Sequence, residues 1–344
     1  MISNLACFPT GVGSLPHTSS KDALDLILKN LPEIPFWPQL SNLSFKENMY
    51  AQFSYLLPNV VIDEKNKRVY IETGKEENVI ENFLNQLIAE KLEYFSYQKE
   101  YFHGLYEMLE KRDGLVDAKV FKGQITGPIS LGFQVTDENR RPIYYDDVYR
   151  DMIVKNLKMM AIWQEQVLKK LCDRTMIFLD EPFLSMIGSA FVSIDREKAV
   201  EQMNEVLKGI EGIKAIHCCA NTDWSLVLET DIDILNFDAY SYADNLFLYS
   251  EKVIDFLDKG GAIAWGIVPT NEEDLDKESP DSLMQRLEKN MRTLANRGIS
   301  MEKILNSSII TPSCGLGSTT IRGAENALPI LKKLSKNMRE KHGL

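Results

Sequence analysis

The sequence predicts an α/β protein in which parallel strands alternate with helices and close into a single (β/α)8 barrel, the TIM-barrel fold, over residues 1–344. Short β-branched runs alternate with amphipathic stretches along the chain, which indicates a parallel sheet with helical crossovers. A length of 344 residues suits one such barrel. The composition, with 44% apolar and 26% charged residues, excludes collagen-like, disordered and disulfide-scaffold proteins.

Seven runs are predicted as strands because each is short and rich in β-branched residues. They are residues 7–13, 117–125, 175–180, 213–219, 232–238, 262–268 and 308–313. Helices are predicted over residues 20–30, 76–94, 146–172, 196–209, 245–258, 278–297 and 321–340. The clearest of them begins at Asp146, because apolar residues recur on one broad face as far as Leu171. Seven or eight strand–helix units of this kind would close the barrel.

Residues 32–72 interrupt this alternation, and we interpret them as an insertion after the first strand. Prolines punctuate an aromatic-rich stretch, and a β-hairpin follows, with strands 60–63 and 68–72 joined through residues 65–67. Such a segment could cover a site or could be a surface elaboration, and the sequence supports both interpretations equally.

Charge and hydropathy exclude several classes of partner. The chain has 39 basic and 50 acidic residues, so it lacks the basic footprint of a nucleic-acid-binding protein. No apolar run approaches the roughly 18 residues of a membrane span. The first residues, Met1 to Asn4, do not begin an export signal, and the five cysteines are an odd number. We therefore expect a cytoplasmic protein with reduced thiols.

The segment that ends the predicted strand 213–219 carries an imidazole and two thiols. Side chains alternate across a strand, so His217 and Cys219 share one face, whereas Cys218 points to the other. A histidine beside a cysteine supplies half of a tetrahedral zinc site. Taken alone, the pair is explained equally well by chance in an apolar strand.

A second apolar run ends in Cys314, directly before Gly315. Barrel active sites are assembled from the C-terminal ends of different strands, so this cysteine is predicted to meet His217 and Cys219, although about 95 residues separate the two cysteines. A third run ends at Asp238, whose carboxylate either fills the remaining metal position, caps the following loop or supports His217.

Two adjacent carboxylates, Asp180 and Glu181, end another predicted strand and precede Pro182. Acids in a barrel mouth are costly unless they bind a cation or are well hydrogen-bonded. The amino group of a substrate would suit one of them, whereas a structural acid would cap neighbouring loops. The structural interpretation is favoured for Glu181 and less so for Asp180, and both are candidate catalytic residues.

Two glycine-containing turns follow predicted strands, at residues 11–14 and 126–128. Glycine lets the backbone approach a ligand closely and exposes N–H groups to a carboxylate. The first turn does not have the spacing of a dinucleotide-binding fingerprint. Its neighbourhood supplies the candidate substrate-binding residues Gly13, Ser14 and His17.

Together these motifs resemble the cobalamin-independent methionine synthase family, within the wider group that includes uroporphyrinogen decarboxylases and corrinoid-linked methyltransferases. The resemblance runs from Gly11 to Gly317. It implies that Ser14 and Asp180 contact the carboxylate and amino group of homocysteine. It also implies a zinc ion held by His217, Cys219, Asp238 and Cys314. The family's distal carboxylate is usually glutamate, so Asp238 is one methylene shorter.

The resemblance implies a zinc-dependent methyltransferase whose acceptor is a small-molecule thiol, with homocysteine converted to methionine. The synthases of bacteria and plants have a second barrel that helps to bind folate, and 344 residues have room only for the catalytic barrel. We therefore expect methylcobalamin or a methylated corrinoid protein as the donor. The alternatives are a methyltransferase for another thiol such as coenzyme M, a uroporphyrinogen decarboxylase-like barrel, a non-catalytic ligand-binding barrel, and a redox role for Cys218 and Cys219.

Overall fold

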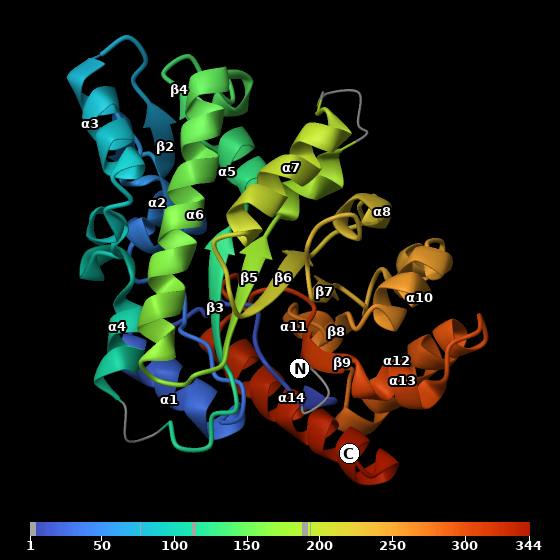
Figure 1. The fold of residues 1–344 in the computed structure, drawn as a ribbon. Helices are drawn as coiled ribbons and strands as arrows, with labels where there is room; N and C mark the ends of the chain where they lie inside the picture. The colour runs from blue at the N-terminus through green and yellow to red at the C-terminus, as the bar shows by residue number, and fades with distance from the viewer. Residues whose placement is uncertain (1–4, 76, 112–114, 188–191, 193) are drawn as a thin grey trace.

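The computed structural model describes residues 5–75, 77–111, 115–187, 192 and 194–344. Its centre is a parallel six-stranded sheet with the order β3-β5-β6-β7-β8-β9, so each strand pairs with the next one along the chain. The strands are β3 (Phe121–Thr126), β5 (Thr175–Asp180), β6 (Ile213–Cys218), β7 (Ile234–Phe237), β8 (Ala262–Val268) and β9 (Ser308–Pro312). The sheet curls, and the helices lie around its outside (Figure 1). The protein is thus α/β with a curled parallel sheet.

Two further segments run beside the edges of this sheet in parallel orientation. Pro9 pairs with Ile310 of β9, and Phe36 pairs with Lys122 of β3, each through an isolated bridge. Both segments lie before β3 in the chain, and a third bridge, Ser14 with Gln39, joins them to each other. Residues 36–39, which fall within the predicted insertion, therefore lie against the main sheet.

A smaller sheet lies apart from the main one. Strands β1 (Val60–Asp63) and β2 (Arg68–Ile71) form an antiparallel hairpin, and the short β4 (Thr136–Asp137) pairs with β2 in parallel. The hairpin differs from the predicted one by a single residue at its C-terminal end.

The long helices match the predicted periodicity, and side-chain caps explain where several of them begin. The Asp146 carboxylate caps α6, and the Ser19 hydroxyl caps α1. The predicted helix 245–258 is instead two helices, α9 and α10. The longer helices are α1 (Ser20–Asn30), α3 (Glu77–Ile88), α4 (His103–Glu110), α6 (Asp147–Lys169), α7 (Arg196–Leu207), α10 (Ser250–Asp258), α12 (Pro280–Ala295) and α14 (Ile321–His342). The shorter ones are α2 (Met49–Ser54), α5 (Pro128–Gln134), α8 (Trp224–Val227), α9 (Ala243–Phe247), α11 (Glu272–Leu275) and α13 (Met301–Asn306).

The inner face of the curled sheet changes from apolar to polar along the strands. Side chains alternate across a strand, and the inner ones near the strand starts form a separate apolar core with Phe8 and Ile34. Its strand members are Met176, Phe178, Ile213, Ala215, Ile234, Ala262, Ala264 and Ile309. The next positions in this alternation are polar and buried, namely Asp180, His217, Asn236 and Thr311. Buried polar groups are therefore gathered toward the C-terminal ends of the strands.

Within the described residues, no helix has both the length and the apolar character that a membrane crossing requires.

Candidate active site

Three potential metal ligands meet at the C-terminal ends of β6 and β9. The ligand atoms of His217, Cys219 and Cys314 all lie within 4.8 Å of one another. His217 belongs to β6, Cys219 follows that strand directly, and Cys314 comes two residues after β9. Cys218 lies on the other face of β6, in the core that packs against the helices. The predicted convergence of these three side chains is therefore present in the structure.

The His217 imidazole is fixed through one of its two nitrogens. His217 is 3% exposed, and its Nδ1 lies 2.6 Å from the Asn236 Oδ1 atom. The Asn236 amide in turn donates to the Ala264 carbonyl at 2.8 Å and to the Thr311 hydroxyl at 2.9 Å. The other ring nitrogen, Nε2, is buried and has no hydrogen-bond partner. One buried nitrogen of the ring is thus left unpaired.

Contact between the two cysteines of this group shifts their pKa values in opposite directions. Contact with the Cys314 thiol and with His217 lowers the pKa of Cys219 to about 4. The same contact and burial raise the pKa of Cys314 well above its ordinary value. Cys219 is therefore the thiol of this pair that loses its proton first, and a thiolate is the form in which cysteine binds a metal. All five cysteines are unpaired.

Asp238 is not part of this group of ligand atoms in the structure. Its Oδ1 accepts a hydrogen bond from the Ser241 N–H at 2.8 Å, in the loop that leads into α9. Of the residues that the structure describes, the ligand group contains only the histidine and the two cysteines. In this geometry the carboxylate caps the loop, and the residue that supports His217 is Asn236.

Asp180 lies beside this group and faces a cavity. It is the register partner of His217 between β5 and β6, it is 6% exposed, and its Oδ1 has no hydrogen-bond partner. Burial raises the pKa of Asp180 to about 6, against the opposing effect of the His217 and Lys122 charges. The cavity has a volume of about 400 Å³ and is lined by Asp180, His217, Cys219 and Cys314 together with Ser14 and Glu47.

Glu181 points away from this cavity and holds the start of helix α5. Its carboxylate accepts hydrogen bonds from the Ile129 N–H at 2.9 Å, the Ser130 N–H at 2.8 Å and the Ser130 hydroxyl at 2.6 Å. A Cβ atom built at Gly127 would overlap this carboxylate, so glycine is needed at that position. A catalytic role for Glu181 has no support in this geometry, because both carboxylate oxygens already serve the helix terminus and Glu181 does not line the cavity.

Besides Asp180, three residues near the first glycine-containing turn are predicted to bind substrate, and they differ in position. Ser14 lines the cavity, and its Oγ accepts a hydrogen bond from the Gly317 N–H at 3.1 Å. Gly13 does not line it but lets the turn approach Gln39, whose Oε1 would lie 2.8 Å from an added Cβ atom. His17 is buried outside the cavity lining, and burial lowers the pKa of its ring against the opposing effect of the Glu325 and Asp22 charges. The structure thus brings only Ser14 of the three to the cavity.

Several buried polar residues near the site were not singled out from the sequence. Lys122 of β3 is fully buried, donates to the Val12 carbonyl at 2.5 Å and lies 4.4 Å from the centre of the Phe178 ring. Burial lowers the pKa of Lys122 to about 7. Glu47 is also buried, lines the cavity and contacts His103 Nδ1 at 2.8 Å. Of these residues, only Lys122 could have been noticed in the sequence, because a lysine stands in a predicted strand of the barrel.

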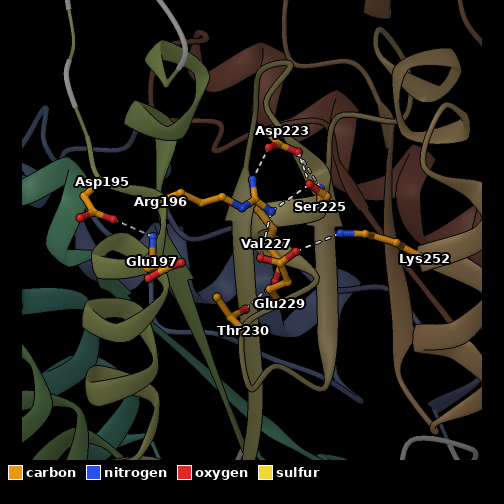
Figure 2. Close-up of polar contacts among 9 residues, drawn as sticks. All are labelled: Asp195, Arg196, Glu197, Asp223, Ser225, Val227, Glu229, Thr230 and Lys252. Carbon is orange, nitrogen blue, oxygen red and sulfur yellow. Dashed lines mark hydrogen bonds and ion pairs between the residues drawn. The ribbon is translucent and has the colours of Figure 1, made fainter.

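The chain that follows Cys219 is held by a network of charged side chains (Figure 2). Arg196, at the start of α7, forms ion pairs with Asp223 and with Glu229. Asp223 also caps α8 by accepting from the Ser225 N–H, and Lys252 of α10 pairs with Glu229 at 2.9 Å. These contacts connect the segment that follows β6, through Asp223 and Glu229, to helices α7 and α10.

Comparisons with known proteins give similarity in fold without similarity in sequence. No family model matches the sequence, and no curated protein matches it. The structure of a B12-independent methionine synthase from Shewanella sp. W3-18-1 in complex with selenomethionine is similar, with a TM-score of 0.62 and 12% identity over 98% of this chain and 99% of that one. A methyltransferase from Methanosarcina mazei is also similar, with a TM-score of 0.56 and 10% identity over 99% of this chain and 98% of that one. The protein therefore has the fold of these methyltransferase structures, in agreement with the family that its motifs resemble.

Proposed function

We propose that this protein is a zinc-dependent methyltransferase that moves a methyl group to the sulfur of homocysteine and so forms methionine. The observation that carries this proposal is the group formed by His217, Cys219 and Cys314, whose ligand atoms lie within 4.8 Å of one another in a cavity that also contains Asp180. One imidazole and two thiols form a donor set that zinc favours in proteins.

The donor atoms fit a zinc ion on physical grounds. The buried Nε2 of His217 has no hydrogen-bond partner, and a buried polar atom left unpaired costs free energy. A metal ion at this point would use the lone pair on Nε2. The lowered pKa of Cys219 favours the thiolate form that a metal ion binds. Three protein ligands leave one position open, as in catalytic zinc sites.

In the proposed reaction, a zinc ion would keep the acceptor's thiol deprotonated and fix its sulfur for attack on the donor's methyl group. His217, Cys219 and Cys314 would hold the ion. The Asp180 carboxylate has one oxygen without a partner and would bind the acceptor's ammonium group. Fixing the acceptor at both its sulfur and its amino group would supply the proximity on which the rate depends.

The charges around the cavity favour an amino-acid thiol over coenzyme M. None of the described residues that line the cavity is a lysine or an arginine, whereas Asp180 and Glu47 are acids. A sulfonate group would therefore meet no cation there. An ammonium group would meet Asp180, whereas both Glu47 oxygens are already engaged by Leu40 and His103. The described lining also has no aromatic ring on which a pterin could stack. This supports methylcobalamin or a methylated corrinoid protein, rather than a folate, as the donor.

We also infer that the curled sheet is part of a closed (β/α)8 barrel. The bridges Pro9–Ile310, Phe36–Lys122 and Ser14–Gln39 connect its two edges through the first two segments of the chain, which supports closure. The unpaired cysteines support a cytoplasmic location for the enzyme.

The test is to measure the zinc content of the purified, reduced protein together with methyl transfer. We expect about one zinc ion per chain after dialysis against a mild chelator, and methionine formation from homocysteine and methylcobalamin. Cys219→Ser and Cys314→Ser should each lose both zinc and activity. Cys172→Ser, at a half-buried cysteine outside the cavity, is the matched control and should keep both.

Three outcomes would contradict parts of this proposal. Folded protein without zinc would exclude the zinc chemistry and favour a decarboxylase-like or binding barrel. Faster methyl transfer to coenzyme M than to homocysteine would identify coenzyme M as the acceptor. Zinc and tight homocysteine binding without transfer from any methyl donor would indicate a non-catalytic binding protein.

A further inference from the structure

We infer that Asn236 is a positioning residue that fixes the tautomer of His217, so that the nitrogen facing the two cysteines carries a lone pair. Asn236 lies on β7 between two register partners, His217 on β6 and Ala264 on β8. It is fully buried. The metal part of this inference rests on the proposed zinc site, whereas the tautomer part does not.

The orientation of the Asn236 amide follows from its partners. The Ala264 carbonyl can only accept a hydrogen bond, so the amide atom 2.8 Å from it must be the NH2 group. That group also reaches the Thr311 hydroxyl at 2.9 Å. The amide oxygen is therefore the atom that faces His217.

This orientation determines which ring nitrogen of His217 carries the proton. An amide oxygen cannot donate, so the 2.6 Å contact between Asn236 Oδ1 and His217 Nδ1 requires a proton on Nδ1. In a neutral imidazole, Nε2 is then unprotonated. Nε2 is the buried nitrogen without a partner, and it is the ring atom left free for the group formed with Cys219 and Cys314.

Asn236 also links β6, which carries His217, to β9, which leads to Cys314. Its oxygen holds the ring on β6, and its NH2 group holds Thr311 on β9, three residues before Cys314. A neutral amide also suits its surroundings, because Asp180 and Cys219 already place negative charge near His217. Asn236 would thus orient the histidine without adding a further charge.

The first test is nitrogen NMR of the imidazoles in the metal-free protein, followed as the pH is raised until the His217 ring is neutral, because the effect of burial is outweighed by contact with Cys219, which raises the pKa of this imidazole. The chain has four histidines, and His217→Gln assigns the signal. We expect His217 to carry its proton on Nδ1, and Asn236→Leu to lose this preference. A proton on Nε2 in the wild-type protein would overturn the inference. This measurement decides the tautomer even if the wild-type protein binds no zinc, an outcome that would contradict the proposed function instead.

The second test is zinc affinity, measured by competition with a chelator. Asn236→Leu removes the acceptor for Nδ1 and should weaken zinc binding by about 10–100-fold. Asn236→Asp keeps that acceptor, and Thr311→Val removes only a partner of the NH2 group, so both should lose less than about tenfold. Wild-type affinity in folded Asn236→Leu, or an equal loss in Thr311→Val, would refute the positioning role. If Asn236→Leu does not fold, Asn236→Ala, which removes the same acceptor with a smaller side chain, takes its place in this comparison.

Discussion

The Ser14 hydroxyl accepts a hydrogen bond from the Gly317 N–H at 3.1 Å and thereby joins the turn after the first chain segment to the loop that carries Cys314. The Leu316 N–H also donates to the Ser14 carbonyl at 2.9 Å. A Cβ atom built at Gly315 would overlap the Ser14 Oγ atom. Ser14 and the residue after Cys314 are therefore packed as closely as their backbones allow.

Gly315→Ala should displace the Cys314 loop and weaken zinc binding, because the added methyl group overlaps Ser14. Overpacking of this kind costs about 1–3 kcal/mol, which corresponds to about a 5–150-fold loss of zinc affinity where the whole cost falls on the bound geometry. Chelator competition measures the zinc affinity, and thermal unfolding measures the stability. The double variant Ser14→Gly with Gly315→Ala removes the overlap and should recover much of the loss. An unaffected Gly315→Ala variant would show that this contact does not position Cys314.

Asp238→Asn should bind zinc with an affinity that falls by less than about tenfold. The amide oxygen can still accept from the Ser241 N–H, which is the contact that the carboxylate makes in the structure. Cys314→Ser, measured in the same chelator competition, is the positive control for loss of a ligand. A loss in Asp238→Asn as large as that in Cys314→Ser would identify Asp238 as a fourth ligand.

Asp180→Asn should raise the KM for homocysteine about 10–100-fold, because a charged hydrogen bond to the ammonium group is worth about 1.5–3 kcal/mol. Zinc content should not change. Steady-state kinetics with homocysteine and with 4-mercaptobutyrate, which lacks the amino group, separate the two roles of this residue. An equal effect on both acceptors would mean that Asp180 acts on the reacting sulfur and not on the amino group.

Glu181→Gln should destabilise the fold without changing the zinc content. An amide has one acceptor oxygen and places its NH2 group against an N–H at the start of α5, so the expected loss is about 1–3 kcal/mol in the free energy of unfolding. Denaturant titration measures it. Glu93→Gln at an exposed position should stay within about 0.5 kcal/mol of the wild type. If Glu181→Gln kept full stability but lost activity, the catalytic interpretation would be restored.

Lys122 should make stability depend on pH in the alkaline range. Burial lowers the pKa of Lys122 from 10.5 to about 7, so between these values the unfolded chain binds a proton that the folded chain does not. Stability is therefore expected to rise with pH from about 7 to about 10.5 through this group. The free energy of unfolding of the wild type minus that of Lys122→Met, measured by denaturant titration at each pH, should increase across this range. If this difference in the free energy of unfolding stays constant or falls as the pH rises, the lowered pKa of Lys122 is contradicted.

The sequence predicted those parts of the structure that local patterns determine. Helices α1, α6 and α14 follow from their 3.6-residue periodicity, and the hairpin of β1 and β2 follows from two short runs around a turn. The meeting of His217 with Cys314 was predictable because parallel strands place their C-terminal ends together.

The remaining features depend on which groups become neighbours after folding. Phe36 makes only a single bridge to the sheet and is surrounded by prolines, so its segment has no strand pattern to detect. Glu181 and Asp180 are adjacent in the chain, and only the position of α5 decides that one serves a helix terminus. Asn236 is an ordinary strand residue until the register sets it beside His217.

The candidate metal ligands come from two distant places in the chain, His217 and Cys219 from one and Cys314 from the other, which has a consequence for folding as well as for chemistry. An ion held by Cys219 and Cys314 would act as a cross-link that closes a loop of about 95 residues and reduces the conformational freedom of the unfolded chain. Because β6 and β9 must both be in place before the ligands meet, metal uptake would report the completed fold rather than a local element. The unfolding temperature should then rise with the concentration of free zinc.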